Sequence, residues 1–298
     1  MTDMTASAAP RTSFVIATRN RAPELEGVLN RLLSTTQCPI IVVDNGSDDG
    51  TAASAHRLAD AYAGRITVIE LEDNLGAVGR NIGVEQCTTP YVAFCDDDSW
   101  WEPESITLAE QIFDKHPTVG LLAARTVVWP QRRDDPVVAA LAGSALGRRV
   151  GLPGPSILGF LACSALVRKS AFEGAGGFSP LLHFRGEEQL LALDMAARGW
   201  DLCYSPDLTA VHQPSTSRLP GRAQQARSRR NAMLTAWLRR PLPRCLSTTA
   251  ELTGCALRDR EHARALLEAV RMAPQVWRQR RPLPASLEAD AAALERQG

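Results

Sequence analysis

Short runs of apolar and β-branched residues alternate with stretches of helical character through the first third of the chain. Four apolar runs predict buried strands, and apolar residues at helical spacing predict a helix after the first of them. Pro23 lies at the start of that helix, where its fixed φ is well tolerated. The predicted strands are Ser13–Ala17, Ile40–Val43, Ile66–Leu71 and Tyr91–Cys95. Strands joined by helices predict right-handed crossovers and a mostly parallel α/β sheet.

Polar residues follow three of these predicted strands. In open α/β sheets, ligands bind beyond the carboxyl ends of the strands. We therefore expect three polar segments to meet at one edge of the sheet: Thr18–Asn20, Asp44–Gly46 and Asp96–Asp98.

The rest of the chain has a less regular middle and a basic C-terminal part. The patterns predict strands at Val119–Val128, Ser164–Val167 and Leu202–Ser205 and a helix at Glu187–Arg198. From residue 208 to residue 250 there is no Asp or Glu, while arginines accumulate. We expect a disordered N-terminus over 1–11, an α/β domain over 12–215 and a basic, helical extension over 216–298.

Composition narrows the possible functions. The chain has 298 residues with 33 basic and 33 acidic side chains, so its formal charge is zero, which argues against a dedicated nucleic-acid binder. Apolar stretches such as Ile157–Val167 are too short to span a membrane, and Met1–Pro10 lacks a signal-peptide pattern. Seven cysteines without a CxxC pair predict free thiols and a cytoplasmic location.

The acidic triplet Asp96–Asp98 is the first candidate for chemistry. Adjacent carboxylates repel one another unless a cation or water screens them. In an extended segment Asp96 and Asp98 point the same way and can share one hard divalent ion that bridges substrate phosphates. A solvated acidic turn is the alternative, but the position at a strand's carboxyl end favours function.

A second acidic pair, Glu187 and Glu188, begins a predicted helix. Acidic residues in a first helical turn are favoured by the helix dipole, so a structural role competes with a role as general base. The lone His212 is either structural or a ligand. Phosphate loops of the GxxxxGK[ST] type, GxGxxG, GxSxG and HExxH patterns are all missing from the sequence.

Six ordered motifs carry a resemblance to a known family. They are Phe14–Asn20 (FVIATRN), Ile41–Gly50 (IVVDNGSDDG), Asn74–Gly83 (NLGAVGRNIG), Phe94–Asp98 (FCDDD), Gly176–Phe178 (GGF) and Gly186–Glu188 (GEE). Over about residues 12–215 the chain resembles the family 2 glycosyltransferases. The resemblance implies the GT-A fold, a Rossmann-like, mostly parallel sheet flanked by helices, followed here by a C-terminal helical extension. It also implies inverting transfer of a sugar from a nucleotide-diphosphate sugar to an acceptor hydroxyl, with Mn²⁺ or Mg²⁺ as cofactor.

The resemblance also implies roles for individual residues. Asp44 matches the aspartate that contacts the nucleotide base, with Thr18 and Arg19 in the same pocket, and Arg80 matches a position near the nucleotide. Asp96 and Asp98 match the DxD pair, Asp96 toward the ribose and Asp98 on the metal. The sites implied for nucleotide-sugar binding are Thr18, Arg19, Asp44, Arg80, Asp96 and Asp97, and those implied for the metal are Asp98, Asp96 and His212.

The general base implied by the resemblance is Glu188, with Glu187 as the alternative. A carboxylate on the acceptor side removes the proton of the attacking hydroxyl, and a single displacement inverts the anomeric carbon. Many relatives have Glu-Asp where this chain has Glu187-Glu188, so the base here stands on a side chain one methylene longer.

Two alternative functions and one partner surface remain open. A nucleotidyltransferase usually needs a glycine-rich loop after the first strand, where this chain has Ala17–Asn20 without glycine. The one observation that favours a catalytically silent nucleotide-sugar binder or scaffold is Glu188, which stands where many relatives have Asp. The basic segment 216–244, with apolar Met233 and Ala236, fits peripheral contact with the anionic inner membrane face or packing against the catalytic domain. The acceptor is not specified by the sequence.

Overall fold

The computed structural model describes residues 9–214 and 221–297. Within these ranges nine strands form one sheet in the order β3-β2-β1-β4-β8-β6-β9-β5, with β7 paired to β6. The first four strands pair in parallel and match the predicted strands within a residue or two. They are β1 (Thr12–Thr18), β2 (Ile40–Asp44), β3 (Ile66–Glu70) and β4 (Tyr91–Cys95). The α/β fold class predicted from the sequence is confirmed.

The second half of the sheet is mixed. β8 runs antiparallel between β4 and β6, β9 runs parallel to β6, and β5 runs antiparallel to β9. β9 is much longer than the predicted strand Leu202–Ser205, because a shift in register between Ala124 and Arg125 of β6 accommodates Pro206, Asp207 and Leu208. The bounds are β5 (Ser99–Trp101), β6 (Val119–Val128), β7 (Arg133–Asp134), β8 (Ala165–Arg168) and β9 (Asp201–His212).

Helices cover both faces of the sheet, so its central strands are apolar throughout. Phe14 and Ile16 of β1 face one apolar cluster with α1, while the intervening Val15 faces a second cluster with α3. The helices of the α/β part are α1 (Ala22–Thr35), α2 (Thr51–Ala61), α3 (Val78–Gln86), α4 (Pro103–Lys115), α5 (Pro136–Ala142), α6 (Lys169–Ala175) and α7 (Glu187–Ala197). The two clusters fix the strand ends that carry the polar segments.

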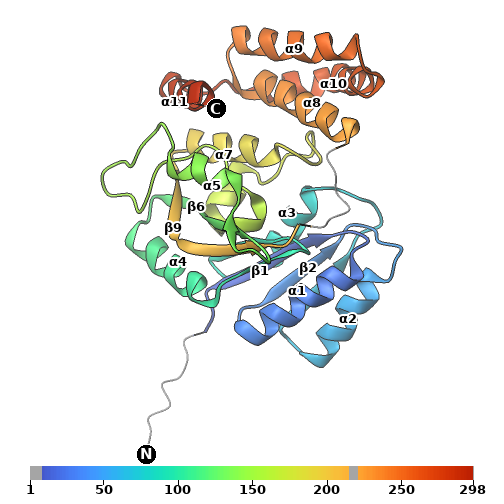
Figure 1. Ribbon diagram of the computed structural model, residues 1–298, viewed down its shortest axis with the longest axis vertical. Coiled ribbons are helices and arrows are strands. Elements are labelled where there is room, and N and C mark those ends of the chain that lie inside the picture. Colours follow the sequence, from blue (N-terminus) through green and yellow to red (C-terminus); the bar gives the residue numbers. More distant parts are fainter. Residues whose placement is uncertain (1–8, 215–220, 298) are drawn as a thin grey trace, which may run out of the picture.

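The C-terminal helices form a separate layer beside α7 (Figure 1). Leu190 of α7 packs in one apolar cluster with Leu234, Leu252 and Ala269, which joins this layer to the α/β part. The helices are α8 (Arg222–Arg239), α9 (Leu242–Ala256), α10 (Arg260–Gln279) and α11 (Ala285–Gln297). None of the helices within the described ranges is long and apolar enough to cross a membrane.

Two of the expected domain boundaries, after residue 11 and after residue 215, lie at or near the limits of the described residues. The expected boundary between 215 and 216 falls within residues 215–220, which lie outside them, as do residues 1–8. Arg11 was expected in a disordered N-terminus, yet its guanidinium donates to both carboxylate oxygens of Asp114, at 2.7 and 2.8 Å. Arg11 therefore contacts the α/β part of the chain through its side chain.

Candidate active site

A cavity of about 210 Å³ lies at the carboxyl ends of β1, β2 and β4. It brings together five of the predicted nucleotide-sugar-binding residues, from segments distant in the sequence. They are Thr18, Arg19, Arg80, Asp96 and Asp97. We call this space the donor cavity. The predicted convergence of strand ends at one edge of the sheet is therefore found in the structure for these residues.

Arg80 is the central cation of the donor cavity. It is 4% exposed, and its Nη2 lies 2.5 Å from Asp96 Oδ1. Burial alone would lower the pKa of Arg80, but the negative charges of Asp96, Glu187 and Glu188 outweigh burial and raise that pKa. Arg80 thus lies within electrostatic reach of both acidic groups that the sequence singled out.

Asp97 occupies the middle of the acidic triplet and is largely buried. Thr18 Oγ1 donates to its Oδ2 at 2.8 Å, and Arg21 Nε donates to its Oδ1 at 3.2 Å. Burial raises the pKa of Asp97 to about 6, with a further contribution from the charges of Asp96 and Asp98. Asp97 therefore carries an electrostatic penalty at neutral pH that its two hydrogen bonds only partly relieve.

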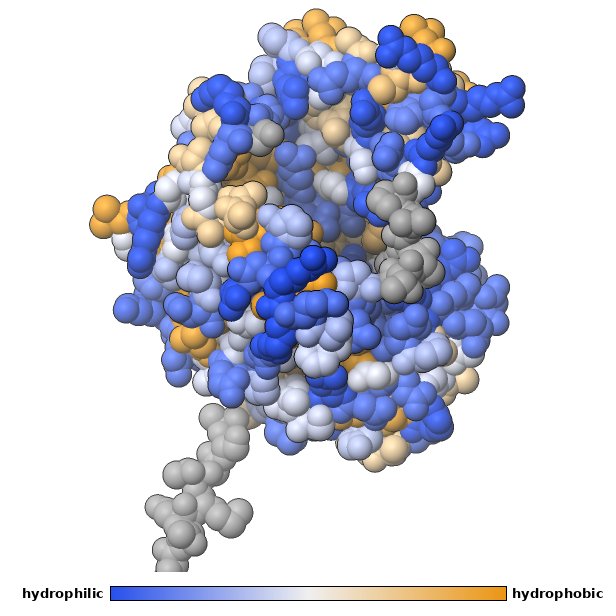
Figure 2. Space-filling view, viewed as in Figure 1, coloured by the Kyte–Doolittle hydropathy of each residue, from blue (hydrophilic) through white to orange (hydrophobic). Residues whose placement is uncertain are grey.

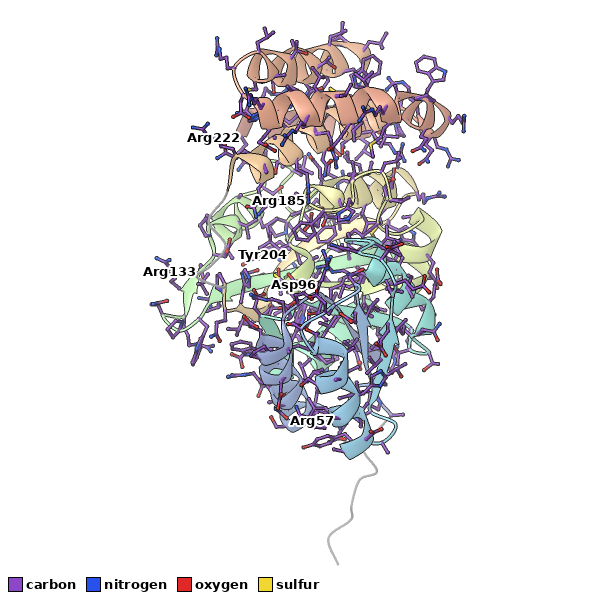
Figure 3. The ribbon with its side chains drawn as sticks, turned by 90° about the vertical axis from the view of Figure 1, so that its right-hand side faces the viewer. Arg57, Asp96, Arg133, Arg185, Tyr204 and Arg222 are labelled. Carbon is purple, nitrogen blue, oxygen red and sulfur yellow. The ribbon has the colours of Figure 1, made fainter. Side chains whose placement is uncertain are left out.

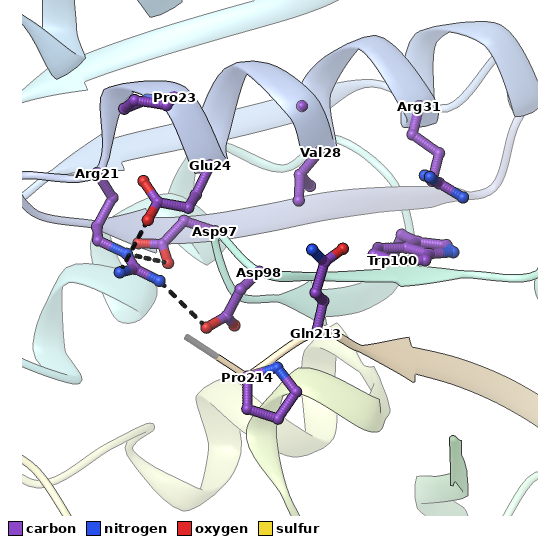
Figure 4. A pocket seen from close by; sticks show the side chains of 11 residues that line it. Arg21, Pro23, Glu24, Val28, Arg31, Asp97, Asp98, Trp100, Gln213 and Pro214 are labelled. Atoms are coloured by element: carbon purple, nitrogen blue, oxygen red, sulfur yellow. Dashed lines mark hydrogen bonds and ion pairs between the residues drawn. The ribbon is translucent and has the colours of Figure 1, made fainter. Parts of the chain in front are cut away.

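Arg21 neutralises two of the three aspartates, and the sequence analysis missed it. Its Nη2 lies 3.3 Å from Asp98 Oδ2, so one guanidinium bridges Asp97 and Asp98 (Figure 4). The available signal was electrostatic: an acidic triplet requires cations nearby, and Arg21 follows the polar end of the first strand. Together Arg80 and Arg21 provide protein cations for all three aspartates.

Asp96 and Asp98 line different cavities, whereas the alternation of an extended strand predicts that they face one common space. The triplet forms a turn after β4, with Ser99 N donating to Asp96 O at 3.2 Å, so the alternation of an extended strand does not apply. Asp98 lines a different cavity, of about 500 Å³, beside α1 and Gln213 (Figure 4). Asp97 lines both cavities. The sharing of one ion by Asp96 and Asp98 stays a prediction.

His212 lies next to Asp98, as the metal-site expectation requires. The pairing of β5 with β9 places Ser99 opposite His212, and His212 Nε2 is 3.5 Å from Asp98 Oδ1. Burial lowers the pKa of His212, but the carboxylate of Asp98 outweighs burial and raises it. His212 Nδ1 is buried and has no hydrogen-bond partner within the described ranges.

This donor set is compatible with a divalent ion that takes most of its ligands from substrate and water. Adjacent ligands of an octahedral ion lie roughly 3 Å apart, close to the separation of Asp98 and His212. Magnesium-like ions often use only one or two protein carboxylates together with substrate phosphates. No group of three or more acidic, His or Cys side chains able to hold a metal occurs within residues 9–214 and 221–297. The protein alone therefore offers a two-ligand site.

Asp44 does not line the donor cavity, although the resemblance placed it on the nucleotide base. It is 2% exposed, and both of its carboxylate oxygens accept hydrogen bonds from Ser47, one from the hydroxyl and one from the backbone N–H. The neighbouring Asn45 lines the cavity instead. In this structure Asp44 holds the turn after β2.

The paired glutamates begin α7, after Gly186 in the left-handed conformation with φ 81°. Both line a cavity of about 410 Å³, which we call the glutamate cavity. Burial raises the pKa of Glu187 and of Glu188, and the charge of Glu188 adds to the effect on Glu187. Phe184 lines both this cavity and the donor cavity, so the two spaces adjoin.

His183 and Gly76 form a contact that the sequence did not predict. Gly76 has φ 61°, and a Cβ there would lie 2.2 Å from His183 O, so only glycine fits. Ala77 N donates to His183 O at 2.7 Å, and His183 Nε2 lies 3.1 Å from Asn74 O. The contact fixes the loop before α3 against the loop before α7, and His183 lines the donor cavity. Neither segment carries a local signal for this tertiary contact.

The C-terminal helices take part in the site through α8. Arg227 of α8 lines the donor cavity, while Ser228 lines the glutamate cavity. The apolar residues Met233 and Ala236, considered above as a membrane-facing surface, are buried. Arginines of the same segment form ion pairs, Arg230 with Glu268 at 2.5 Å and Arg240 with Glu288 at 2.6 Å. The structure thus supports the packing alternative for this segment.

Residues of the loop before α7 and of α8 line the space between the α/β layer and the C-terminal helices (Figure 3). Asp96 lies at the edge of the sheet, and Arg185 lies on the loop above it, toward α8. Two acidic clusters, four arginines and two adjoining cavities thus define a site suited to an anionic, polyhydroxylated ligand.

A family model of glycosyl transferase family 2 matches residues 13–175, and the chain belongs to this family. The resemblance found in the sequence motifs is thereby confirmed. The chain is 35% identical over 96 residues to glycosyltransferase AglE of Haloferax volcanii, and the match covers 31% of this chain and 32% of that protein. It is 32% identical over 218 residues to the pre-mycofactocin glycosyltransferase of Mycobacterium tuberculosis, covering 68% of this chain and 43% of that protein. The chain thus spans less than half the length of these two relatives.

A solved structure shares the fold. The mannosyltransferase PcManGT from Pyrobaculum calidifontis, in complex with GDP-Man and Mn²⁺, superposes with a TM-score of 0.62 at 18% identity. The match covers 97% of this chain and 86% of that chain, so it includes the C-terminal helices. The GT-A fold expected from the motifs is confirmed.

Proposed function

We propose that this chain transfers a sugar from a nucleotide-diphosphate sugar to an acceptor hydroxyl, with inversion at the anomeric carbon and with help from a divalent cation. The observation that carries the proposal is the adjacency of the donor cavity, with its arginines and aspartates, to the glutamate cavity. Donor and base then lie on two sides of one reaction centre. Membership of the family and the GDP-Man in the related mannosyltransferase structure support the choice of donor.

The donor cavity offers the groups that a nucleotide diphosphate needs. Arg19, Arg80 and Arg227 line it and supply cations for the diphosphate oxygens. Asp96 lines the same cavity and can accept from ribose hydroxyls. As the glycosidic bond breaks, negative charge grows on the leaving diphosphate, and fixed guanidinium groups stabilise that charge without reorganisation.

Asp98 and His212 would hold the divalent cation, next to Asp97, which lines both the cavity of Asp98 and the donor cavity. When bound, the ion neutralises charge on the leaving diphosphate as a Lewis acid. Arg21 fixes the orientation of the Asp98 carboxylate by its ion pair at 3.3 Å. The Mn²⁺ in the related mannosyltransferase complex supports a divalent ion in this fold.

We assign the general base to Glu188. Its side chain is partly exposed in the glutamate cavity, whereas Glu187 is 2% exposed. A base is most effective when its pKa lies near the working pH, and burial raises the pKa of Glu188 from the ordinary glutamate range in that direction. Glu187 then acts on the site through its charge and its place at the start of α7.

Nucleotide release tests the proposal. The full chain is incubated with UDP-, GDP- and dTDP-sugars, Mn²⁺ and a panel of sugar acceptors, and free nucleoside diphosphate is measured. We expect release with at least one donor, its loss in Asp98→Ala, and its retention in Lys115→Ala, a change at an exposed residue of α4. Donor binding without release indicates a silent binder, and pyrophosphate in place of nucleoside diphosphate indicates a nucleotidyltransferase. Either result overturns the proposal.

A further inference from the structure

The glutamate cavity is walled on one side by the C-terminal helices, where the space-filling view shows the molecule hollowed (Figure 2). Ser228, Ala232 and Thr235 of α8 line it at helical spacing, so one face of α8 with short side chains leaves room for a ligand. Its volume of about 410 Å³ lies in the range of small-molecule sites.

A buried oxygen in this cavity lacks a partner. Glu187 lines the cavity at 2% exposure, and its Oε2 has no hydrogen-bond partner within the described ranges. A buried polar atom without a hydrogen bond is costly, and a ligand hydroxyl would supply the missing donor. The cavity is therefore built to receive a hydroxylated group.

A second, largely apolar cavity of about 500 Å³ adjoins the first. Gln189 of α7 lines both cavities. The segment before β8 also borders both, since Leu158 and Phe160 line the apolar cavity and Leu161 lines the glutamate cavity. Apolar side chains from three helices complete its wall: Val137 and Leu141 of α5, Leu193 of α7, and Ala291 and Leu294 of α11.

We propose that the acceptor is an amphiphile. Its uncharged, hydroxyl-bearing head occupies the glutamate cavity, and an apolar substituent on that head lies in the apolar cavity between α5 and α11. The inference rests on the proposed function for the identity of the head as acceptor. The two cavities meet at Gln189, and this adjacency is the reason for assigning the apolar one to the same ligand.

Charge favours a neutral head over a phosphorylated one. Within the described lining of the two cavities, Arg185 is the one basic side chain, and its Nη2 donates to Gln224 Oε1 at 2.9 Å. The acidic side chain of the apolar cavity, Glu295, is ion-paired with Arg240 at 2.6 Å. A phosphate in the glutamate cavity would face Glu187 and Glu188, and like charges in a buried space repel strongly.

Binding of matched glycosides tests the proposal independently of turnover. Methyl and octyl glycosides of several hexoses are titrated into the full chain by calorimetry, alone and with UDP or GDP, below the concentration at which the octyl compounds form micelles. Each fully buried methylene strengthens binding about fourfold. We therefore expect at least one octyl glycoside to bind tenfold or more tightly than its methyl counterpart.

A substitution at Gly159 locates the apolar group. Gly159 lines the apolar cavity, and an added Cβ there meets no atom within 4 Å, so Gly159→Leu fills space without a backbone clash. We expect this variant to lose most of the octyl preference and to keep the affinity for the methyl glycoside. Gly174→Leu is the matched control, because Gly174 is equally unobstructed and lies on α6, away from both cavities.

A second substitution locates the head. Ala232 is exposed on α8 and lines the glutamate cavity. Ala232→Trp should therefore weaken the binding of both methyl and octyl glycosides at least tenfold and leave nucleotide binding unchanged. Ala223→Trp, at an exposed position of the same helix outside the described lining, is its control.

Three results would overturn the inference: no measurable binding of any octyl glycoside, an octyl preference unchanged in Gly159→Leu, or tighter binding of a sugar 1-phosphate than of its methyl glycoside. Failure of the proposed function appears separately, as absence of nucleoside diphosphate release in the same preparation. The chain can prefer octyl glycosides, and lose this preference in Gly159→Leu, even if it releases no nucleoside diphosphate. Conversely, it can release nucleoside diphosphate even if it shows no octyl preference.

Discussion

Arg80 Nη2 lies 2.5 Å from Asp96 Oδ1, and the charges of Glu187 and Glu188 act on the same guanidinium. A single buried cation therefore couples the donor side of the site to its acceptor side. Because Arg80 is 4% exposed, its charge is poorly screened by solvent, and its removal affects both acidic groups.

Removal of this cation is expected to destabilise the protein and weaken donor binding. Arg80→Ala leaves Asp96, Glu187 and Glu188 without their compensating charge, and we expect the free energy of unfolding to fall by about 3 kcal/mol. Chemical denaturation measures the change. Arg57→Ala, which breaks the exposed pair of Arg57 with Glu26, is the control and should cost about 0.5 kcal/mol. Equal effects of the two substitutions would contradict the coupling.

Asp97 should make the protein less stable as pH rises. Its pKa in the folded chain is about 6, above the reference value of 3.8, so between these values the folded chain keeps a proton that the unfolded chain has lost. Stability therefore falls as pH rises from about 4 through 6. We expect Asp97→Asn to stabilise the protein by about 2 kcal/mol at pH 7 and hardly at all at pH 4.

Thermal or chemical unfolding at the two pH values checks this expectation. Asn has the same shape and keeps an oxygen that accepts from Thr18, but its NH2 group replaces the oxygen that accepts from Arg21 Nε. The exposed Asp60→Asn serves as control and should change stability at neither pH. A loss of stability in Asp97→Asn at pH 7 would show that the ion pair with Arg21 outweighs burial.

The raised pKa values of the glutamates predict the pH profile of the reaction. A general base works only when deprotonated, so kcat/KM should rise with pH through a range above that of an ordinary glutamate. Glu188→Gln should lower kcat by roughly 10²–10⁴-fold and abolish this limb of the profile, while nucleotide affinity stays unchanged. Glu187→Gln should keep much of the activity and shift the pH range over which kcat/KM rises, because it removes a charge next to Glu188. The reverse ranking of the two variants would move the base to Glu187.

Much of the donor side could be predicted from the sequence because it depends on local patterns. Apolar runs located β1 to β4, polar residues at their carboxyl ends located Thr18 and Asp96 at one site, and the family motifs added Arg80 of α3. The alternation argument failed for Asp98, because the chain turns immediately after β4.

Features set by tertiary packing could not be predicted in this way. The cation at Arg21 is assigned only once α1 and the acidic turn are placed together, and the contact of His183 with Gly76 joins segments more than a hundred residues apart. Likewise, Met233 and Ala236 share a helix face whether it packs on protein or lipid, and only the folded arrangement shows them buried.

The contact of Gly76 with His183 has its own test. Gly76→Ala adds a Cβ 2.2 Å from a backbone oxygen in a left-handed conformation, so we expect a loss of at least about 3 kcal/mol in stability. Gly147 has the same φ of 61° but no atom within 4 Å of an added Cβ, and Gly147→Ala should cost only about 1 kcal/mol. The difference, measured by denaturation, reports the close approach alone. Similar losses of stability in the two variants would mean that the loop before α3 moves to accommodate the added Cβ at little cost.

The anomeric configuration of the product tests the central claim most directly. Proton NMR is followed as the full chain, Mn²⁺, an α-linked nucleotide-diphosphate sugar and an accepted alkyl glycoside react. Direct displacement by a hydroxyl activated at Glu188 predicts free nucleoside diphosphate and a new β-linkage as the first product. An α-linked first product, or a donor left intact under conditions where it binds, would contradict the account.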